Sequence, residues 1–167
     1  MFKVGEKIIY PLHGAGEIDQ IVRREVGGVE QEYYDITLQE GLIRVSLPVS
    51  NAGKMRIRRI IGKKEAGSVL EHFKEYRADC SIPWNKRYKE NLEVLKTGDS
   101  YKTAEVVKLL MLRDRSVGLS TGDRQTMIVA RNLLAGELSL SLCCTKKELL
   151  EEFQQIVESE FGAPQPV

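Results

Sequence analysis

The sequence predicts an α+β chain of two modules, in which a small antiparallel β-barrel precedes an all-helical module of about five helices. Three observations lead to this fold class. Up to residue 60, short segments rich in β-branched and aromatic residues alternate with glycine-containing turns. From Lys63 onward, apolar residues recur at the three- and four-residue spacing of helix faces. In that second stretch, Pro83 is the only proline before Pro164.

The first module is expected to contain five short strands. A Gly-Gly pair at 27–28 permits the positive φ angles of a tight hairpin turn. In the fourth strand, apolar residues alternate with polar ones, which indicates that one face lies in a core. The five segments, which together favour an SH3- or Tudor-like barrel, are residues 7–10, 17–23, 32–38, 42–48 and 55–60.

The second module is expected to contain five helices. Trp84, Tyr88, Leu92 and Leu95 are four, four and three residues apart, which places them on one face of the second helix. Gly98 is expected to end that helix. The five segments are residues 63–76, 84–96, 103–115, 120–136 and a last helix that starts with the capping box at 145–148.

These patterns divide the chain into a β module over residues 1–62, a helical module over residues 66–160 and a flexible tail over residues 161–167.

The net charge is +1, from 25 basic and 24 acidic side chains, so bulk charge does not favour nucleic-acid binding. Residues 63–115 hold 12 basic and 9 acidic side chains, whereas residues 116–167 hold 4 and 7. A DNA-facing surface is therefore expected in the middle third.

The three cysteines, Cys80, Cys143 and Cys144, form no C-x-x-C motif and are typical of free thiols in a reducing cytosol. The adjacent pair is expected to be buried and structural.

The first residues are charged where a signal peptide needs an apolar run, and no apolar stretch approaches the roughly 20 residues of a bilayer span. We expect a soluble cytoplasmic protein without a membrane partner.

The sequence contains no recognisable catalytic constellation. His13 and His72 lie in different modules, and neither has a histidine or cysteine at metal-ligand spacing. The phosphate-binding loop, the dinucleotide fingerprint, the nucleophile elbow and H-E-x-x-H are all absent. The glycines at 14 and 16 precede a strand, so a barrel turn is favoured over a phosphate site. The sequence predicts a protein that is not an enzyme and uses no metal or cofactor.

Residues 82–89, Ile-Pro-Trp-Asn-Lys-Arg-Tyr-Lys, join the sole tryptophan to three basic residues at a helix start. Lys86, Arg87 and Lys89 could neutralise phosphates, and Trp84 could wedge or stack where a duplex is kinked or open. In the alternative interpretation, Trp84 anchors the core in register with Tyr88 and the basic residues form a solvated face. Spacing alone favours the core, and both interpretations stay open at this point.

In the β module, the pair at 23–24, Arg-Arg, and the strand at 42–48 are candidates for partner binding. An edge strand can add a strand of another protein through main-chain hydrogen bonds. In the alternative interpretation, these arginines only keep the barrel soluble.

The chain resembles the CarD/CdnL family, which shares its N-terminal module with transcription-repair coupling factor. The similarity runs in order over residues 1–158. The matching stretches are Phe-Lys-Val-Gly-Glu-Lys-Ile-Ile-Tyr-Pro-Leu-His-Gly at 2–14, Pro-Trp-Asn-Lys-Arg-Tyr-Lys-Glu-Asn-Leu at 83–92, Gly-Leu-Ser at 118–120, Ala-Arg at 130–131 and Gly-Glu-Leu at 136–138.

The resemblance implies a Tudor-like module that binds the β subunit of RNA polymerase through a strand edge. Arg24 matches a polymerase-facing arginine, and the strand contributes Arg44, Val45, Ser46 and Leu47. Some family members carry an arginine at the position of Ser46. Here Arg44 lies two residues earlier on the same strand face.

The resemblance also implies that the helical module reaches the upstream edge of the melted promoter. There a tryptophan wedges into the minor groove and slows collapse of the bubble, and Trp84 matches it. The DNA-facing basic positions correspond to Lys86, Arg87, Lys89 and Arg124.

We therefore expect a monomeric regulator that stabilises the open promoter complex, with weak and largely sequence-independent affinity for promoter DNA. A second hypothesis is a polymerase-docking adaptor whose helical module binds another protein instead of DNA. An exposed Trp84 ring beside lysines would favour DNA, and a buried ring would favour the adaptor.

Overall fold

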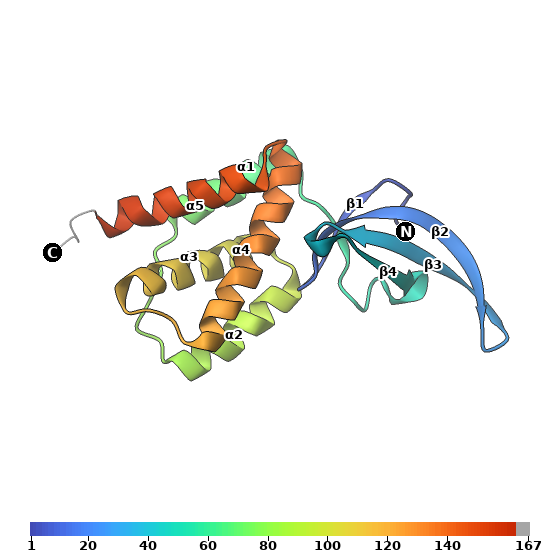
Figure 1. Ribbon diagram of the computed structural model, residues 1–167, viewed down its shortest axis with the longest axis horizontal. Coiled ribbons are helices and arrows are strands. Elements are labelled where there is room, and N and C mark those ends of the chain that lie inside the picture. Colours follow the sequence, from blue (N-terminus) through green and yellow to red (C-terminus); the bar gives the residue numbers. More distant parts are fainter. Residues whose placement is uncertain (163–167) are drawn as a thin grey trace. The chain divides into compact units, whose positions relative to one another are not determined.

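The computed structural model describes residues 1–162, except for the side chain of Trp84. The chain divides into two compact units, Met1–Ile60 and Ile61–Val167, called here the β unit and the helical unit (Figure 1). The α+β fold class is confirmed, with a five-stranded antiparallel sheet in the first unit and five α-helices among the described residues of the second. Most of the expected tail at 161–167 lies outside the described residues.

The sheet of the β unit has the strand order β4-β3-β2-β1-β5, so β4 and β5 are its two edges. The long β2–β3 hairpin projects beyond the other strands (Figure 1). The strands are β1 (Lys7–Tyr10), β2 (Gly14–Val26), β3 (Val29–Leu38), β4 (Ile43–Pro48) and β5 (Arg58–Arg59).

All five expected strands are present, and the two of the hairpin are longer than the sequence indicated. Gly27 and Gly28 have φ angles of 61° and 79°, which lets Val26 pair with Val29 directly at the turn. The fifth strand is shorter than expected. Arg56 lies in the left-handed region with a φ of 54°, so pairing with β1 starts only at Arg58.

A β-bulge in β2 decides which side chains face the core of this unit. Ile18 pairs with Ile36 and Gln20 pairs with Asp35, so Asp19 is an extra residue between two neighbouring pairs. Because side chains alternate along a strand, the extra residue moves Gln20 to the face opposite Ile18. The core cluster contains Ile8, Ile18, Tyr34, Ile36, Leu38, Leu47, Ala52 and Ile57.

The five expected helices of the second module are also present. Gly98 ends the second helix in the left-handed conformation, with a φ of 71°. Thr145 and Glu148 form the expected capping box. The helices are α1 (Lys63–Glu75), α2 (Trp84–Thr97), α3 (Ser100–Ser116), α4 (Thr121–Leu142) and α5 (Lys146–Phe161).

Helix α4 continues past Gly136, where the sequence indicated its end. Ala135, Gly136 and Leu138 are all buried, and the helix ends only at Cys143, which has a φ of 56°. One glycine in a helix costs about 1 kcal/mol relative to alanine, which the burial of the surrounding turns outweighs.

Helix α3 is central to the helical unit, since it contacts α1, α2, α4 and α5. The stripe expected from its sequence is buried, including Val107 and Leu110. The rings of Phe73 in α1 and Phe153 in α5 pack with centroids 4.8 Å apart.

Among residues 1–162, no single helix is long and apolar enough to cross a membrane, and α4 and α5 pass that test only as a pair bent by 117°.

Candidate polymerase and DNA interfaces

A polar cluster lies on the face of the β unit opposite the core. The Arg24 guanidinium contacts both carboxylate oxygens of Asp35 at 2.9 Å and donates to the Ser46 hydroxyl at 2.6 Å. Ser46 in turn donates to Asp35 at 2.6 Å, and Gln20 donates to Asp35 at 2.8 Å. The guanidinium also lies 5.4 Å from the ring centroid of Tyr33. The Asp35 carboxylate therefore orients Arg24, the arginine that the family resemblance matches to a polymerase contact.

Asp35 is held in its charged form by these neighbours. The hydrogen bond from Ser46, followed by that from Gln20, lowers the pKa of the Asp35 carboxyl below its ordinary value, and the charge of Arg24 adds to the effect. Sequence reasoning did not single out Asp35 or Gln20. The only signal for Asp35 was a carboxylate next to the aromatic and β-branched residues of its strand. The bulge at Asp19 that brings Gln20 to this face is not visible in the sequence.

This cluster borders an open cavity of about 450 Å³. Arg44 lies on the same strand face as Ser46, as expected from the sequence, and both face this cavity. The lining residues are Asp19, Gln20, Arg24, Asp35, Thr37, Arg44, Val45 and Ser46. Three of the five predicted polymerase-binding residues, Arg24, Arg44 and Ser46, are thus brought together on this face. Val45 also borders the cavity, but it packs against the core of the β unit opposite Ile36.

The fifth predicted residue, Leu47, needs a correction. It lies opposite Tyr34 in the sheet, is 6% exposed and packs in the core of the β unit. Because Leu47 and Ser46 are neighbours in a strand, their side chains point to opposite faces. Leu47 stabilises the sheet and is not available to a partner.

In the helical unit, α2 begins at Trp84, directly after Pro83. Lys86 and Lys89 are exposed in its first turns, as DNA contact would require. The Lys86 ammonium lies 3.9 Å from the Glu90 carboxylate, a loose pair that water screens. The structure does not describe the side chain of Trp84, so the predictions for this residue stay predictions.

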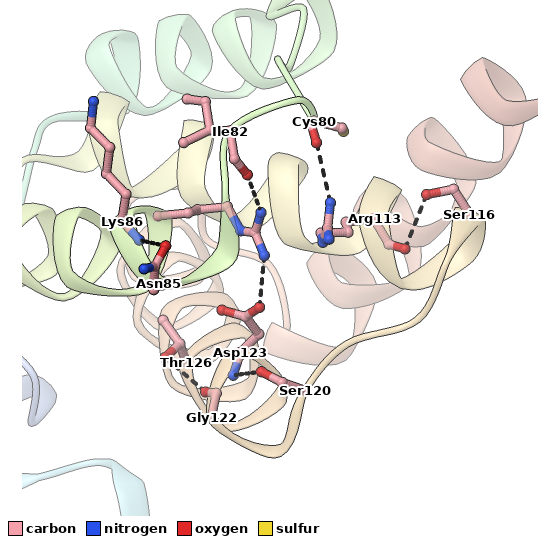
Figure 2. A network of polar contacts seen from close by, with 11 residues as sticks. Cys80, Ile82, Asn85, Lys86, Arg113, Ser116, Ser120, Gly122, Asp123 and Thr126 are labelled. Atoms are coloured by element: carbon pink, nitrogen blue, oxygen red, sulfur yellow. Dashed lines mark hydrogen bonds and ion pairs between the residues drawn. The ribbon is translucent and has the colours of Figure 1, made fainter.

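Arg87 lies in the interior, which corrects the prediction of a DNA contact and also the alternative of a solvated face. It is 1% exposed, and its Nη2 lies 2.9 Å from Oδ2 of Asp123 in α4, which is also 1% exposed. Its Nη1 donates to the main-chain carbonyl of Ile82 at 2.8 Å (Figure 2). Because the guanidinium is buried, it is not exposed to a phosphate in this structure.

Helix α2 packs against the first turn of α4. Ser120 caps the helix, because its hydroxyl accepts the N–H of Asp123 at 3.2 Å (Figure 2). The ring of Tyr88 packs so closely on Gly122 that an added Cβ would lie 3.2 Å from it. The Gly-Leu-Ser motif at 118–120 therefore leads into the turn on which α2 packs.

Arg124, the remaining predicted DNA contact, lies next to Asp123 in α4. Its side chain is half exposed and its Nη2 lies 3.1 Å from the Asp114 carboxylate. Contact with a phosphate would therefore compete with this ion pair.

All three cysteines are free, as expected, but the adjacent pair is not buried. Cys143 is exposed at the end of α4, and Cys144 is half-buried. Burial, followed by the nearby Glu148 and Glu152, raises the pKa of the Cys144 thiol above its ordinary value. Such a thiol is a poor nucleophile. Among residues 1–162, no three His, Cys, Asp or Glu side chains gather as metal ligands.

Both units match known protein families. Residues 2–61 match the CarD-like/TRCF RID domain, and residues 68–161 match the C-terminal domain of CarD. A curated relative from Bacillus subtilis (strain 168), "Putative transcription factor YdeB", is 31% identical over 149 residues, which cover 89% of this chain and 97% of the relative. With both family domains in order and this relative aligned over nearly its whole length, the chain belongs to the CarD family of transcription factors.

Proposed function

We propose that this chain binds the β subunit of RNA polymerase through its β unit and stabilises the open promoter complex through its helical unit. The helical unit would contact the minor groove at the upstream edge of the bubble. The observation that carries this proposal is the start of α2, where exposed Lys86 and Lys89 lie in the same two turns as Trp84 in a chain with both CarD domains. The regulator would act in the cytoplasm and associate with the nucleoid through polymerase.

The polymerase contact would use β4, which is an edge strand of the sheet that the structure describes and could pair with a strand of the β subunit. Arg24, Arg44, Val45 and Ser46 border this edge and its cavity. Arg44 would supply the positive charge that some family members carry at the position of Ser46. Arg24 is already oriented by Asp35, so little rotamer freedom would be lost on binding.

The DNA contact would be weak by itself. Lys86, Lys89 and Arg124 remain as phosphate contacts, and three contacts give a log–log salt slope of about −2.7. Binding to polymerase holds the helical unit near the promoter and raises its effective concentration. The wedge of Trp84 would add little sequence preference, because the minor groove has a degenerate pattern of donors and acceptors.

The test is the lifetime of the open complex on one promoter, with wild type and with Trp84→Ala. We expect the variant to bind polymerase as wild type does but to shorten the lifetime to near that without the protein. A folded Trp84→Ala variant with the wild-type lifetime would contradict the DNA half of the proposal.

A second candidate is the polymerase-docking adaptor, in which the helical unit binds a protein. Two observations favour it: Arg87 is buried and Arg124 is paired with Asp114, which leaves fewer cations for phosphates. The salt dependence of open-complex lifetime separates the two functions. Direct DNA contact by this chain makes its effect decline with salt, and Lys86→Ala together with Lys89→Ala should reduce that slope by about 1.8.

A further inference from the structure

We propose that Arg87 and Asp123 form a buried positioning pair that fixes the turn Ile82–Pro83 and, through it, the start of α2 at Trp84. This inference rests on the proposed role of Trp84 at the promoter. It gives a different function to a basic residue that the sequence placed among the DNA contacts.

One guanidinium joins three segments of the chain. Arg87 lies in the first turn of α2, donates to the carboxylate of Asp123 in the first turn of α4, and donates to the carbonyl of Ile82 in the preceding loop. Arg87 also donates its main-chain N–H to the carbonyl of Pro83 at 3.0 Å. The two residues before Trp84 are thus both bonded to Arg87.

A second arginine also donates to this loop. Arg113 of α3 donates to the carbonyl of Cys80 at 3.2 Å (Figure 2). Between the end of α1 and the start of α2 the chain has no regular secondary structure, so its own backbone does not determine where α2 begins. Side chains from α2 and α3 supply the missing hydrogen bonds at two carbonyls of this loop.

The chemistry of the pair favours a geometric role over a stabilising one. Taking two charges out of water is costly, and an apolar pair of similar volume often stabilises a core as well. Here Arg87 Nε and Asp123 Oδ1 have no hydrogen-bond partner among the side chains that the structure describes, so within this part of the chain the pair does not use all the bonds open to it. Only the planar guanidinium directs two donors at fixed angles, one to the Asp123 carboxylate and one to the Ile82 carbonyl. An apolar pair would make neither hydrogen bond.

The sole tryptophan makes this inference measurable without DNA, because all indole emission comes from Trp84. The variant is Arg87→Lys, which keeps the positive charge but replaces the planar fork with one ammonium on a flexible stem. We expect it to retain its circular dichroism and polymerase binding, and to increase the fast component of the Trp84 anisotropy decay. Open-complex lifetime should fall towards the Trp84→Ala value, with an unchanged salt slope.

Lys89→Ala is the matched control, since it removes an exposed cation two residues further along α2. We expect this control to leave the Trp84 emission unchanged and to reduce the salt slope by about 0.9. If Arg87→Lys does not fold, the double variant Arg87→Met with Asp123→Leu removes both charges together and leaves neither unpaired. The same change in the Trp84 anisotropy is then expected from the double variant.

Combining Arg87→Lys with Trp84→Ala tests whether Arg87 acts through Trp84. The combined variant should have the lifetime of Trp84→Ala alone, because residues that act through one another are not additive. A folded Arg87→Lys variant, or a folded Arg87→Met with Asp123→Leu variant, whose Trp84 anisotropy decay equals that of wild type would overturn the inference. So would a reduction of the salt slope by about 0.9 in Arg87→Lys, which would indicate a direct phosphate contact.

The outcomes also separate this inference from the proposed function. If Trp84→Ala leaves open-complex lifetime unchanged, the proposed function fails. The anisotropy of Trp84 in Arg87→Lys still decides whether the pair positions the start of α2.

Discussion

At the scale of single residues, the partners of each arginine decide what it can do. Arg24 and Arg87 are both basic residues next to a carboxylate, yet Arg24 is exposed beside a cavity and Arg87 is buried between helices. An exposed guanidinium with an oriented side chain can accept a new acidic partner at little cost. A buried one would first have to leave its carboxylate unpaired, which is strongly unfavourable.

Ser46→Ala should raise the pKa of the Asp35 carboxyl, because the Ser46 hydroxyl donates the hydrogen bond that lowers it most. Since Asp35 has a lowered pKa in the folded state, its contribution to stability is present above about pH 3.9, the ordinary value for aspartate. That contribution is lost as the pH falls through the folded-state pKa. Titration of the carboxyl carbon by NMR measures the shift. Thr37→Ala, which removes a hydroxyl bonded to Asp19 and not to Asp35, should leave it unchanged.

Leu47→Ala and Arg44→Ala should separate folding from binding on one strand. Loss of the buried Leu47 side chain is expected to destabilise the β unit by about 2–5 kcal/mol. Arg44→Ala should leave stability within about 0.5 kcal/mol of wild type and weaken binding to the polymerase β subunit. Urea unfolding and a binding assay measure the two effects. Full polymerase affinity in Arg44→Ala would argue against β4 as the docking edge.

At the scale of elements, local signals explain where most strands and helices begin and end. Gly98 and the capping box at Thr145 lie at the ends that the sequence indicated. Two features follow from packing instead: the bulge at Asp19 that turns Gln20 to the outer face, and the extension of α4 through Gly136. In α4, burial of the neighbouring side chains outweighs the local preference of Gly136.

Two glycine-to-alanine changes should have opposite effects on stability. Gly98→Ala places a Cβ in the left-handed region and should destabilise the helical unit by about 1–2 kcal/mol. Gly67 lies inside α1 with no atom within 4 Å of an added Cβ, so Gly67→Ala should stabilise by about 0.5–1 kcal/mol. Denaturant midpoints of the two variants test this. A destabilising Gly67→Ala would show that α1 needs the space or the flexibility of glycine.

At the scale of the whole molecule, the proposed function depends on the covalent link between two units with different partners. The β unit would supply affinity for polymerase, and the helical unit would act on DNA with few phosphate contacts. Linking two binding modules can raise the overall affinity by about 10²–10⁴-fold without any new contact.

The double variant Arg24→Ala with Arg44→Ala should therefore lose the effect on open-complex lifetime at low protein concentration. Because its helical unit is unchanged, the effect should return at a concentration about 10²–10⁴-fold higher. A titration of open-complex lifetime against protein concentration measures the shift. Loss of the effect at every concentration, in a folded variant, would mean that the β unit does more than concentrate the helical unit at the promoter.

The sequence by itself determined the order of the two modules, the presence of five strands and five helices, and the helix ends at Gly98 and Thr145. These features depend on alternation, helical spacing and turn residues that lie close together in the chain. The sequence did not separate Leu47 from Ser46, which were both predicted to bind polymerase, whereas the sheet places Leu47 in the core and Ser46 on the outer face. The burial of Arg87 was decided only by the tertiary structure. Its partner Asp123 lies 36 residues away on another helix, and no local pattern shows that their first turns pack together. A basic residue beside a tryptophan has the same sequence signal whether it faces DNA or a carboxylate in the core.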